Sequence, residues 1–190
     1  MSFLNHFDKK YSKKLAKRAK TFRSIFEILE QRNRHYYLII EMGCARMKDN
    51  YVGDGMSTIL FDEFVNFYNG QVLSVDINED RCKFARKITS DKTIVTCEDS
   101  VKFLWELDPA FDIDLLYLDS FYINRNNPHP SMFHHMKEFC AIIGKLNKET
   151  LVIVDDHFDE KVGKGAYISD FMKNLGYERF IDDYQIGWVL

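Results

Sequence analysis

The sequence has few of the residues that mark several other classes of protein. Its 190 residues include only three prolines, and 46% of them are hydrophobic. A disordered chain is therefore excluded, and a single domain with one sizeable core is favoured. No run approaches the roughly 20 apolar residues that span a bilayer. The start, MSFLNHFDKK, also lacks the continuous apolar core of a signal peptide. We therefore expect a soluble, cytoplasmic protein without membrane association.

Cysteine is equally scarce. The four cysteines stand far apart and form neither a CxxC pair nor the tight framework of a small secreted protein. They are Cys44, Cys82, Cys97 and Cys140. This spacing favours a reducing compartment.

Negative charge is almost absent from the first 34 residues. They hold ten Lys/Arg and three Asp/Glu, a local net charge of +7. Because the whole chain has a net charge of −3, residues 35–190 have a net charge of −10. Within this stretch an apolar stripe recurs at spacings of four and three, as on one face of an amphipathic helix. Its members are Leu15, Ala19, Phe22, Phe26 and Leu29.

We interpret residues 1–34 as a basic, amphipathic helical segment packed against a domain formed by residues 35–190. The cations around the stripe then form its solvated face. An anionic partner or substrate is the alternative. Nucleic acid is a weak candidate, because the rest of the chain is acidic and would repel phosphates.

Short apolar runs alternate with amphipathic stretches from residue 35 onward. Five runs predict buried strands: Tyr36–Ile40, Val72–Val75, Ile94–Cys97, Ile113–Leu118 and Leu151–Val154. The stretches between and after them predict helices near Met56–Asn69, Glu79–Thr89, Ser100–Leu107, Pro130–Leu146 and Ala166–Leu175. Glycine follows two of these helices, at Gly70 and Gly176, as a C-cap residue would.

This alternation predicts a doubly wound α/β fold with a mostly parallel sheet and helices on both faces. The ending differs from the repeat, because Tyr177–Ile181 and Ile186–Leu190 flank a polar turn at residues 182–184. We expect a terminal hairpin that adds an antiparallel strand.

Ligands of such sheets bind beyond the carboxyl ends of the strands, where this chain has glycines and acids. The first strand ends in Glu41-Met42-Gly43, and Gly53-Asp54-Gly55-Met56-Ser57-Thr58 leads into the next helix. Glycines allow a close backbone approach, and the free N–H groups of a helix start suit an anion. An ordinary βα connection is the alternative.

The second and third strands end in further acids. Asp76 is placed to accept hydrogen bonds from both ribose hydroxyls of an adenosine, unless Asn78 caps the next helix and Asp76 is only a surface residue. Asp99 could accept from an adenine amino group, with Ser100 beside it, or could equally be a plain N-cap.

Together these residues resemble class I S-adenosylmethionine (SAM) dependent methyltransferases over about residues 36–190. The segments GDGMSTILF, YLDS and VIVDDHF are similar to small-molecule O-methyltransferases of the catechol and macrocin types. The resemblance implies a seven-stranded sheet with an antiparallel last strand. It also implies SAM as cofactor, with Glu41 and Gly43 near its methionine part, Asp76 on the ribose, and Asp99 with Ser100 near the adenine. We add Gly55, Ser57, Thr58 and Asp119 to the candidate cofactor contacts.

One departure from the family concerns its glycines, which usually sit close together after the acidic residue. Here CARMKDNYV separates Gly43 from Gly53. Either this loop is an insertion over the cofactor, or the choice of contacting glycines is partly wrong.

The resemblance also suggests a metal. In metal-dependent relatives an Asp after the fourth strand and an Asp-Asp or Asp-Asn pair after the fifth bind a divalent ion, and the matching residues here are Asp119, Asp155 and Asp156. Such oxygen ligands suit Mg²⁺, Ca²⁺ or Mn²⁺. The alternative is a general base or hydrogen-bond partner without metal. The lysine that catechol-type enzymes carry shortly after the first Asp is not evident in Asp119-Ser120-Phe121-Tyr122.

Candidate catalytic bases are Asp119 and three histidines, His134, His135 and His157. A packed or surface histidine is the alternative for each. Gly163-Lys164-Gly165 resembles a phosphate-cradling turn without the full P-loop pattern, and we interpret it as a mobile loop beside the acceptor pocket.

Three classes of function fit these features. A methyltransferase acting on a small-molecule acceptor, at a hydroxyl oxygen, is the main hypothesis. A non-catalytic SAM-binding or interaction module is the second. A nicotinamide-dependent oxidoreductase is the weakest, because G-x-G-x-x-G is absent. The sequence does not identify the acceptor. It also does not decide between a monomer and a homo-oligomer.

Overall fold

The computed structural model describes residues 2–190 and confirms the doubly wound architecture. Seven strands form one sheet in the order β3-β2-β1-β4-β5-β7-β6. The strands are β1 Tyr37–Met42, β2 Gly70–Asp76, β3 Thr93–Cys97, β4 Leu115–Leu118, β5 Leu151–Val154, β6 Ile181–Asp182 and β7 Ile186–Val189. The first five strands are parallel to one another, whereas β7 is antiparallel to both β5 and β6. The predicted hairpin is therefore present.

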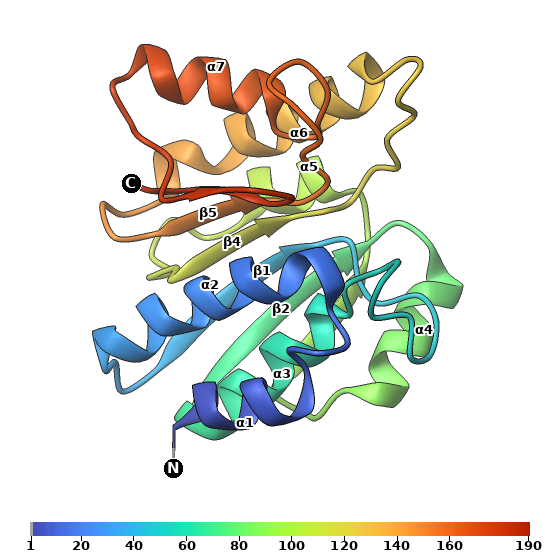
Figure 1. The fold of residues 1–190 in the computed structure, drawn as a ribbon, viewed down its shortest axis with the longest axis vertical. Coiled ribbons are helices and arrows are strands. Elements are labelled where there is room, and N and C mark those ends of the chain that lie inside the picture. The colour runs from blue at the N-terminus through green and yellow to red at the C-terminus, as the bar shows by residue number, and fades with distance from the viewer. Residues whose placement is uncertain (1) are drawn as a thin grey trace.

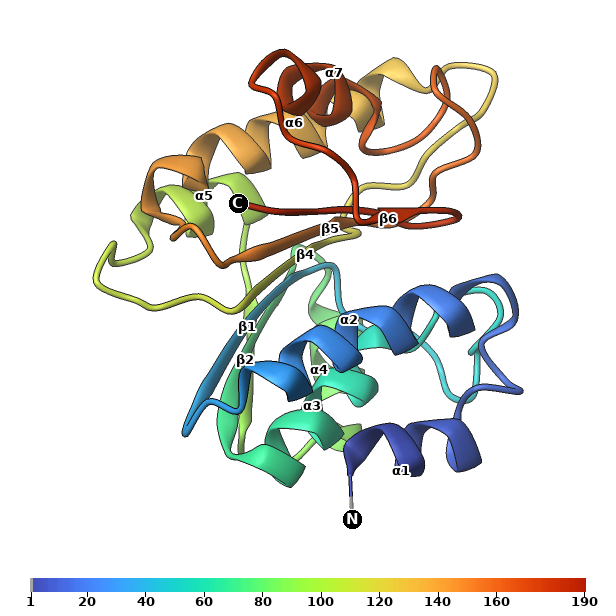
Figure 2. The ribbon, with the colours of Figure 1, turned by 60° about the vertical axis from the view of Figure 1, so that its left-hand side comes forward.

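Helices cover both faces of the sheet (Figures 1 and 2). They are α1 Phe3–Lys10, α2 Ala19–Arg32, α3 Ser57–Tyr68, α4 Glu79–Ile88, α5 Ser100–Glu106, α6 His129–Ile142 and α7 Ala166–Asn174, with short 3-10 turns at Ala16–Arg18 and Ile143–Lys145. In Figure 2, α1 to α4 lie on one side of the sheet and α5 to α7 on the other. None of the helices in residues 2–190 is long and apolar enough to cross a membrane.

Two hydrophobic clusters, one on each face, hold these layers together. One joins α1, α2 and α3 to the sheet through aromatic side chains such as Phe22, Phe26 and Tyr117. The other joins α5, α6 and α7 to the opposite face through Leu118, Phe139 and Met172. Successive residues of a strand point to opposite faces, so each near-continuous apolar run serves both clusters.

The basic N-terminal segment belongs to the first of these clusters, but it is not one continuous helix. Ala16 has a φ of +48°, which interrupts the helix before Ala19. Leu15 is fully buried outside α2, while Phe22 and Phe26 are buried within it. The apolar stripe therefore packs as expected, although its first member lies in a turn.

Two smaller expectations also need correction. Gly70 does not cap a helix: Asn69 occupies that position, and Gly70 begins β2 beside the Tyr37 carbonyl oxygen, which a Cβ would approach to 2.3 Å. The first strand of the final hairpin is only two residues long rather than five. Gly176, by contrast, follows the end of α7 with a φ of +82°, as a C-cap glycine should. All four cysteines are free.

Candidate functional site

Acidic side chains gather where the carboxyl ends of the parallel strands meet. Glu41 lies beside Ser74 in the sheet register, and both belong to the face covered by α3. Asp119 and Asp155 follow Tyr117 and Ile153 by two residues, and those two side chains pack in the cluster with α2. Because strand side chains alternate, these carboxylates point toward the α2 and α3 layer.

Gly43 brings two strand ends into close contact. Its φ is +91°, and a Cβ there would lie 2.5 Å from the Asp119 carbonyl oxygen. Only glycine tolerates both the left-handed backbone and this approach. The loops that follow β1 and β4 therefore touch at the centre of the sheet edge.

A cavity of about 270 Å³ opens beside this contact. It is lined by Val75, Asp76, Ile77, Asp99, Ser100, Ser120, Phe121 and His134. Its volume is just below the range of about 300–1,000 Å³ usual for whole small-molecule sites. The cavity suits part of a ligand, such as a nucleoside, and it unites Asp76, Asp99 and Ser100 as the sequence predicted.

The polar groups of this cavity also have internal partners. Asp76 Oδ1 accepts a hydrogen bond from the Asn78 backbone N–H at 2.8 Å. The Asp99 carboxylate accepts from the Lys102 N–H at 2.9 Å, so Asp99 does cap α5. Asn78 likewise caps α4. Asp76 Oδ2 also accepts from the Cys44 N–H at 3.4 Å and lies 3.5 Å from Arg81 Nη1. These contacts and a ligand contact can coexist, because the two oxygens of a carboxylate can accept about four hydrogen bonds.

Three other predicted cofactor residues form an internal network instead. Glu41 is fully buried, and its two oxygens accept hydrogen bonds from Ser57 and Ser74, each at 2.5 Å. Burial raises the pKa of the Glu41 carboxyl group to about 7, although these hydroxyls act in the opposite direction. Thr58 Oγ1 accepts from the Ala45 N–H at 2.8 Å. These residues hold the start of α3 against β1 and β2, and none of them lines the cavity.

Gly55 has a different neighbour. Its φ is +71°, and a Cβ there would lie 2.8 Å from Arg18 Cδ. The absence of a side chain at Gly55 is explained by the packing of Arg18, so the choice of this glycine as a cofactor contact has no support from its surroundings.

The three acids predicted from the fourth and fifth strands do converge. Asp119, Asp155 and Asp156 each offer a carboxylate oxygen within 4.8 Å of the others. We call these three residues the acid cluster. Carboxylates so close together repel one another unless positive charge or protons offset them.

Arg18 and Lys164 supply that positive charge. Arg18 Nε lies 3.0 and 2.8 Å from the two oxygens of Asp155, and Arg18 Nη2 lies 3.2 Å from Asp156 Oδ1. Lys164 Nζ contacts Asp119 Oδ1 and lies 3.0 Å from Asp156 Oδ2. The Arg18 and Lys164 side chains are each only 4% exposed.

Electrostatics favour the ionised forms of Lys164 and Asp156 but act against that of Asp119. Burial alone would lower the pKa of Lys164, but the carboxylates of Asp119 and Asp156 outweigh it and raise that pKa. Burial and the carboxylates of Asp155 and Asp156 raise the pKa of Asp119 well above its ordinary value, although Lys164 acts in the opposite direction. Because the ammonium contacts the carboxylate directly, we assign the pair as ionised. For Asp156, Lys164 and Tyr184 outweigh burial and lower the pKa.

As arranged, the acid cluster does not fit a divalent ion. Lys164 Nζ lies between oxygens of Asp119 and Asp156, and both oxygens of Asp155 are occupied by Arg18. An ion would have to displace these cations to reach its ligands at about 2.0–2.6 Å. The convergence of the acids is thus confirmed, while a bound metal remains a prediction.

The three histidines occupy different surroundings. His134 Nε2 lies 3.1 Å from Ser100 Oγ and 3.2 Å from Glu138 Oε1, and His134 lines the cavity beside Asp76. His135 is fully buried, and burial lowers its pKa to about 4. It is therefore a packed, neutral side chain with no exposed edge for an acceptor.

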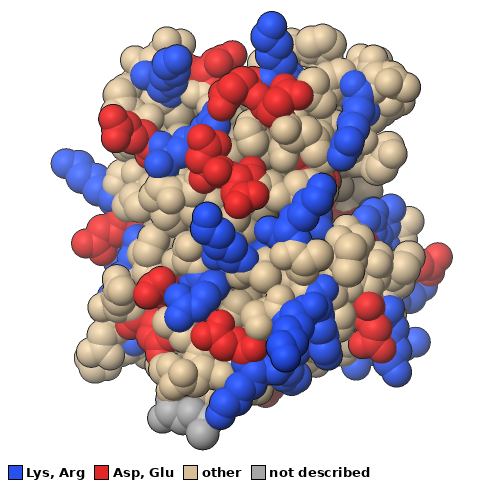
Figure 3. Space-filling view, viewed as in Figure 1, with Lys and Arg blue, Asp and Glu red and all other residues tan. Residues whose placement is uncertain are grey.

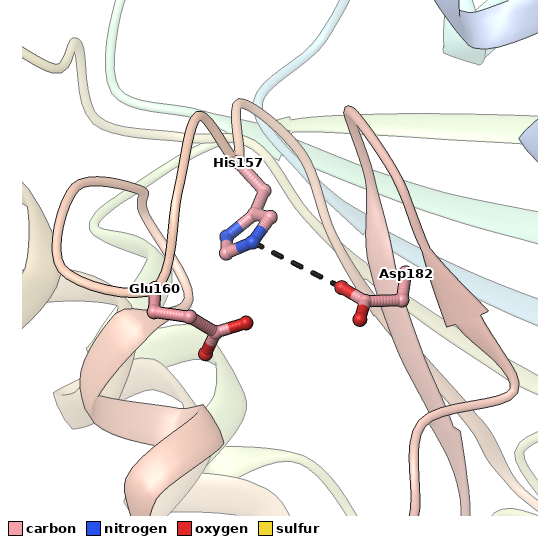
Figure 4. Close-up of side chains that lie close together, drawn as sticks. All are labelled: His157, Glu160 and Asp182. Atoms are coloured by element: carbon pink, nitrogen blue, oxygen red, sulfur yellow. Dashed lines mark ion pairs between the residues drawn. The ribbon is translucent and has the colours of Figure 1, made fainter.

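His157 does not line the cavity beside Asp76; it lies on the loop after β5. Its Nε2 is 4.0 Å from Asp182 Oδ1, with Glu160 nearby (Figure 4). Arg179 already pairs with both acids, at 2.9 Å from Glu160 and 2.7 Å from Asp182. Burial and Arg179 lower the pKa of His157.

A second cavity, of about 650 Å³, lies next to the acid cluster. It is lined by Lys17, Arg125, His157, Phe158, Asp182, Asp183 and Tyr184. Tyr184 connects the two features, because its hydroxyl group donates to Asp156 Oδ1 at 2.6 Å. A molecule bound here would meet the aromatic rings of Phe158 and Tyr184 and charged groups of both signs.

Sequence reasoning missed Arg18 and Lys164 as site residues. The sequence predicts Arg18 to be one of the solvated cations of the basic segment, and Lys164 to lie in a mobile loop. The available signal was charge balance, since three converging carboxylates require nearby cations. No lysine closely follows Asp119 in the sequence, but Lys164 contacts the Asp119 carboxylate in space.

Comparisons with known proteins show the fold. No family model and no curated protein sequence matches the chain. Among solved structures, the MycE methyltransferase of the mycinamycin biosynthetic pathway, in complex with Mg, SAH and mycinamycin VI, is 15% identical over 90% of this chain, with a TM-score of 0.62. The O-methyltransferase NovP is 12% identical over 87% of this chain and 75% of its own length, with a TM-score of 0.56. NSun6 from Pyrococcus horikoshii, with SFG, is 12% identical over 85% of this chain, with a TM-score of 0.57. The chain spans about half the length of MycE, at 48%, and of NSun6, at 50%. At these identities the likeness shows that the chain has the fold of SAM-dependent methyltransferases.

Proposed function

We propose that this protein is a SAM-dependent methyltransferase that methylates a hydroxyl oxygen of a small-molecule acceptor. The observation that carries the proposal is the cavity at the end of β2, where Asp76, Asp99 and Ser100 meet. It lies beside the Gly43 contact and opens at the sheet edge where ligands of doubly wound folds bind. The likeness to MycE and NovP is consistent with this reaction.

The cavity has the chemistry that an adenosine group requires. The carboxylate of Asp76 can accept hydrogen bonds from ribose hydroxyls, and such bonds to a charged group are worth about 1.5–3 kcal/mol. Ile77 is 73% exposed, and Phe121 is 44% exposed on the same lining. These apolar surfaces can cover the faces of a purine ring, which would remove them from water.

Methyl transfer needs an acceptor oxygen in line with the sulfonium methyl group, and a route for the proton. SAM supplies the electrophilic methyl group, and the acceptor oxygen gains it as the carbon–sulfur bond breaks. Asp119 lies at the end of β4 in contact with Gly43, and its Oδ2 has no hydrogen-bond partner among residues 2–190. We propose that this oxygen accepts the hydroxyl proton, while Lys164 holds the other oxygen.

A small acceptor is proposed rather than nucleic acid. Figure 3 shows that basic side chains are densest over α1 and α2, while basic and acidic side chains are mixed over the rest of that face. The second cavity is lined by Asp182 and Asp183 as well as by Lys17 and Arg125. Such a mixed lining suits a small polar or aromatic molecule better than a phosphate backbone, which binds surfaces of uniformly positive charge.

Ligand-induced stabilisation tests the proposal. SAM or S-adenosylhomocysteine at 100 times Kd should raise the stability by about 2.7 kcal/mol, which for this size of domain is about 5–11 °C in Tm. NADH at the same concentration should leave Tm unchanged, which distinguishes an oxidoreductase of similar fold. If neither SAM nor S-adenosylhomocysteine shifts Tm and calorimetry detects no binding, the proposed function is wrong.

A non-catalytic SAM-binding module is the competing outcome. It would show the same Tm shift without turnover. Release of S-adenosylhomocysteine, measured across a panel of phenols, sugars and macrolides, separates the two. Release of S-adenosylhomocysteine with any hydroxyl acceptor supports the methyltransferase over the non-catalytic module.

A further inference from the structure

The acid cluster is held by side chains from distant parts of the chain. Arg18 comes from the 3-10 turn before α2, and Lys164 comes from the loop before α7. Together they contact all three carboxylates. The charges nearly balance, because three carboxylates and two cations leave one negative charge.

Three further contacts fix the position of the Arg18 side chain. Its Nη1 donates to the Val52 carbonyl oxygen at 3.0 Å, and its guanidinium lies 4.6 Å from the centre of the Tyr184 ring. Its aliphatic stem fills the space that Gly55 leaves open. Such packing fixes the planar fork of an arginine against a carboxylate.

Neighbouring cations do not share this placement. Lys13, Lys14, Lys17 and Lys20 are all exposed, whereas Arg18 is 3% exposed. Among the four lysines and Arg18, Arg18 is the cation that contacts the acid cluster, and it does so where an ion bridging Asp155 and Asp156 would otherwise lie. Lys164 takes the corresponding place between Asp119 and Asp156.

We infer that Arg18 and Lys164 replace a divalent ion, so that the protein holds its acid cluster in the active arrangement without metal. The N-terminal segment thereby forms part of the acceptor side of the site. Arg18 and Lys164 are positioning residues: they fix Asp119 and Asp156 rather than reacting themselves. Their role toward an acceptor rests on the proposed function, but the exclusion of metal does not.

Binding of Mn²⁺ alone tests this inference without SAM or an acceptor. Wild-type protein should show no saturable Mn²⁺ binding at the cluster up to about 1 mM, by calorimetry and by electron paramagnetic resonance. That concentration is the upper end of the weak range, about 10⁻⁴–10⁻³ M, of Ca²⁺ sites in extracellular modules. Its Tm should be equal in MnCl₂ and in chelator. Lys164→Gln should gain Mn²⁺ affinity at least tenfold, because the ammonium no longer occupies the space between Asp119 and Asp156. Lys161→Gln, three residues away and exposed, is the matched control and should behave as wild type.

Asp155→Asn identifies which site an observed ion uses, since His157, Glu160 and Asp182 form a second group of possible ligands. One Mn²⁺ per wild-type chain whose binding Asp155→Asn abolishes would overturn the inference. So would a folded Lys164→Gln protein with no gain in Mn²⁺ affinity. If Lys164→Gln does not fold, the comparison of wild type in MnCl₂ and in chelator still decides. If the wild-type protein does not bind SAM in a separate measurement, the proposed function is refuted, but the Mn²⁺ result stays valid.

Discussion

Arg18 and Asp155 form a buried ion pair between residues 137 positions apart in the sequence. Arg18 Nε donates to both carboxylate oxygens, at 3.0 and 2.8 Å, and the Asp155 side chain is fully buried. A pair this far from water is held by geometry and additional hydrogen bonds rather than by attraction alone. It joins the N-terminal segment to the end of β5, at the centre of the candidate site.

Arg18→Gln should destabilise the protein by about 3–5 kcal/mol, because it leaves the Asp155 carboxylate buried without its cation. Urea unfolding followed by circular dichroism measures this change. Lys20→Gln, two residues along and exposed, should stay within about 0.5 kcal/mol of wild type. The double variant Arg18→Gln, Asp155→Asn should recover part of the loss, and a loss equal to the sum of the two single variants would argue against the pair.

Much of the fold could be predicted from hydrophobic pattern. The five apolar runs became β1 to β5 with shifts of a few residues, and the polar turn near Asp183 marked the hairpin of β6 and β7. Asp76 ends β2, and Asp119 and Asp155 directly follow β4 and β5; all three lie at one edge of the sheet because parallel strands bring their carboxyl ends together.

The partners of those acids could not be predicted in the same way. Lys17 and Arg18 are adjacent and similar in type, yet one is exposed and the other buried. What separates them is the turn at Ala16, with its φ of +48°, and the pocket between Gly55 and Tyr184. Both depend on tertiary packing, which periodicity does not encode. The break between α1 and α2 was missed for the same reason.

Asp76→Asn should weaken SAM binding by about 1.5–3 kcal/mol, roughly 10- to 150-fold in Kd, if its carboxylate accepts from the ribose. Calorimetry with S-adenosylhomocysteine measures this. Asp80→Asn is the control, because that side chain is 95% exposed and outside the cavity lining. Equal affinity of the Asp76→Asn variant and wild type would remove Asp76 from the cofactor site.

Gly43→Ala should destabilise the protein by at least about 2 kcal/mol, since a left-handed alanine costs about 1–2 kcal/mol and overpacking adds about 1–3 kcal/mol. Its Cβ would lie 2.5 Å from the Asp119 carbonyl oxygen, which is backbone and cannot rotate away. Gly144→Ala makes the same chemical change where a Cβ meets nothing within 4 Å. It should be neutral or slightly stabilising in the same thermal and urea unfolding assays. Similar losses at both positions would show that the Gly43 contact is not the cause.

Glu41 should make stability fall as pH rises. Burial raises its pKa in the folded protein to about 7, whereas an unfolded glutamate titrates near 4.5. Between these values the folded state binds more protons than the unfolded state, so the free energy of unfolding decreases with pH by about 3 kcal/mol in total. The stabilising effect of the protonated carboxyl group is thus complete below pH 4.5 and lost above pH 7.

Glu41→Gln removes this dependence, because the amide is neutral throughout. The difference in unfolding free energy between Glu41→Gln and wild type should therefore rise by about 2.5 kcal/mol from pH 5 to pH 8, most of the total effect. Burial lowers the pKa of His135 to about 4, which makes stability fall as pH drops below 6.5, but this contribution is present in both proteins and cancels in the difference. Glu106→Gln, with a side chain 59% exposed, is the control and should give a flat difference. A flat difference for Glu41→Gln as well would mean that the buried carboxyl group is already ionised at pH 5, stabilised by the Ser57 and Ser74 hydroxyls.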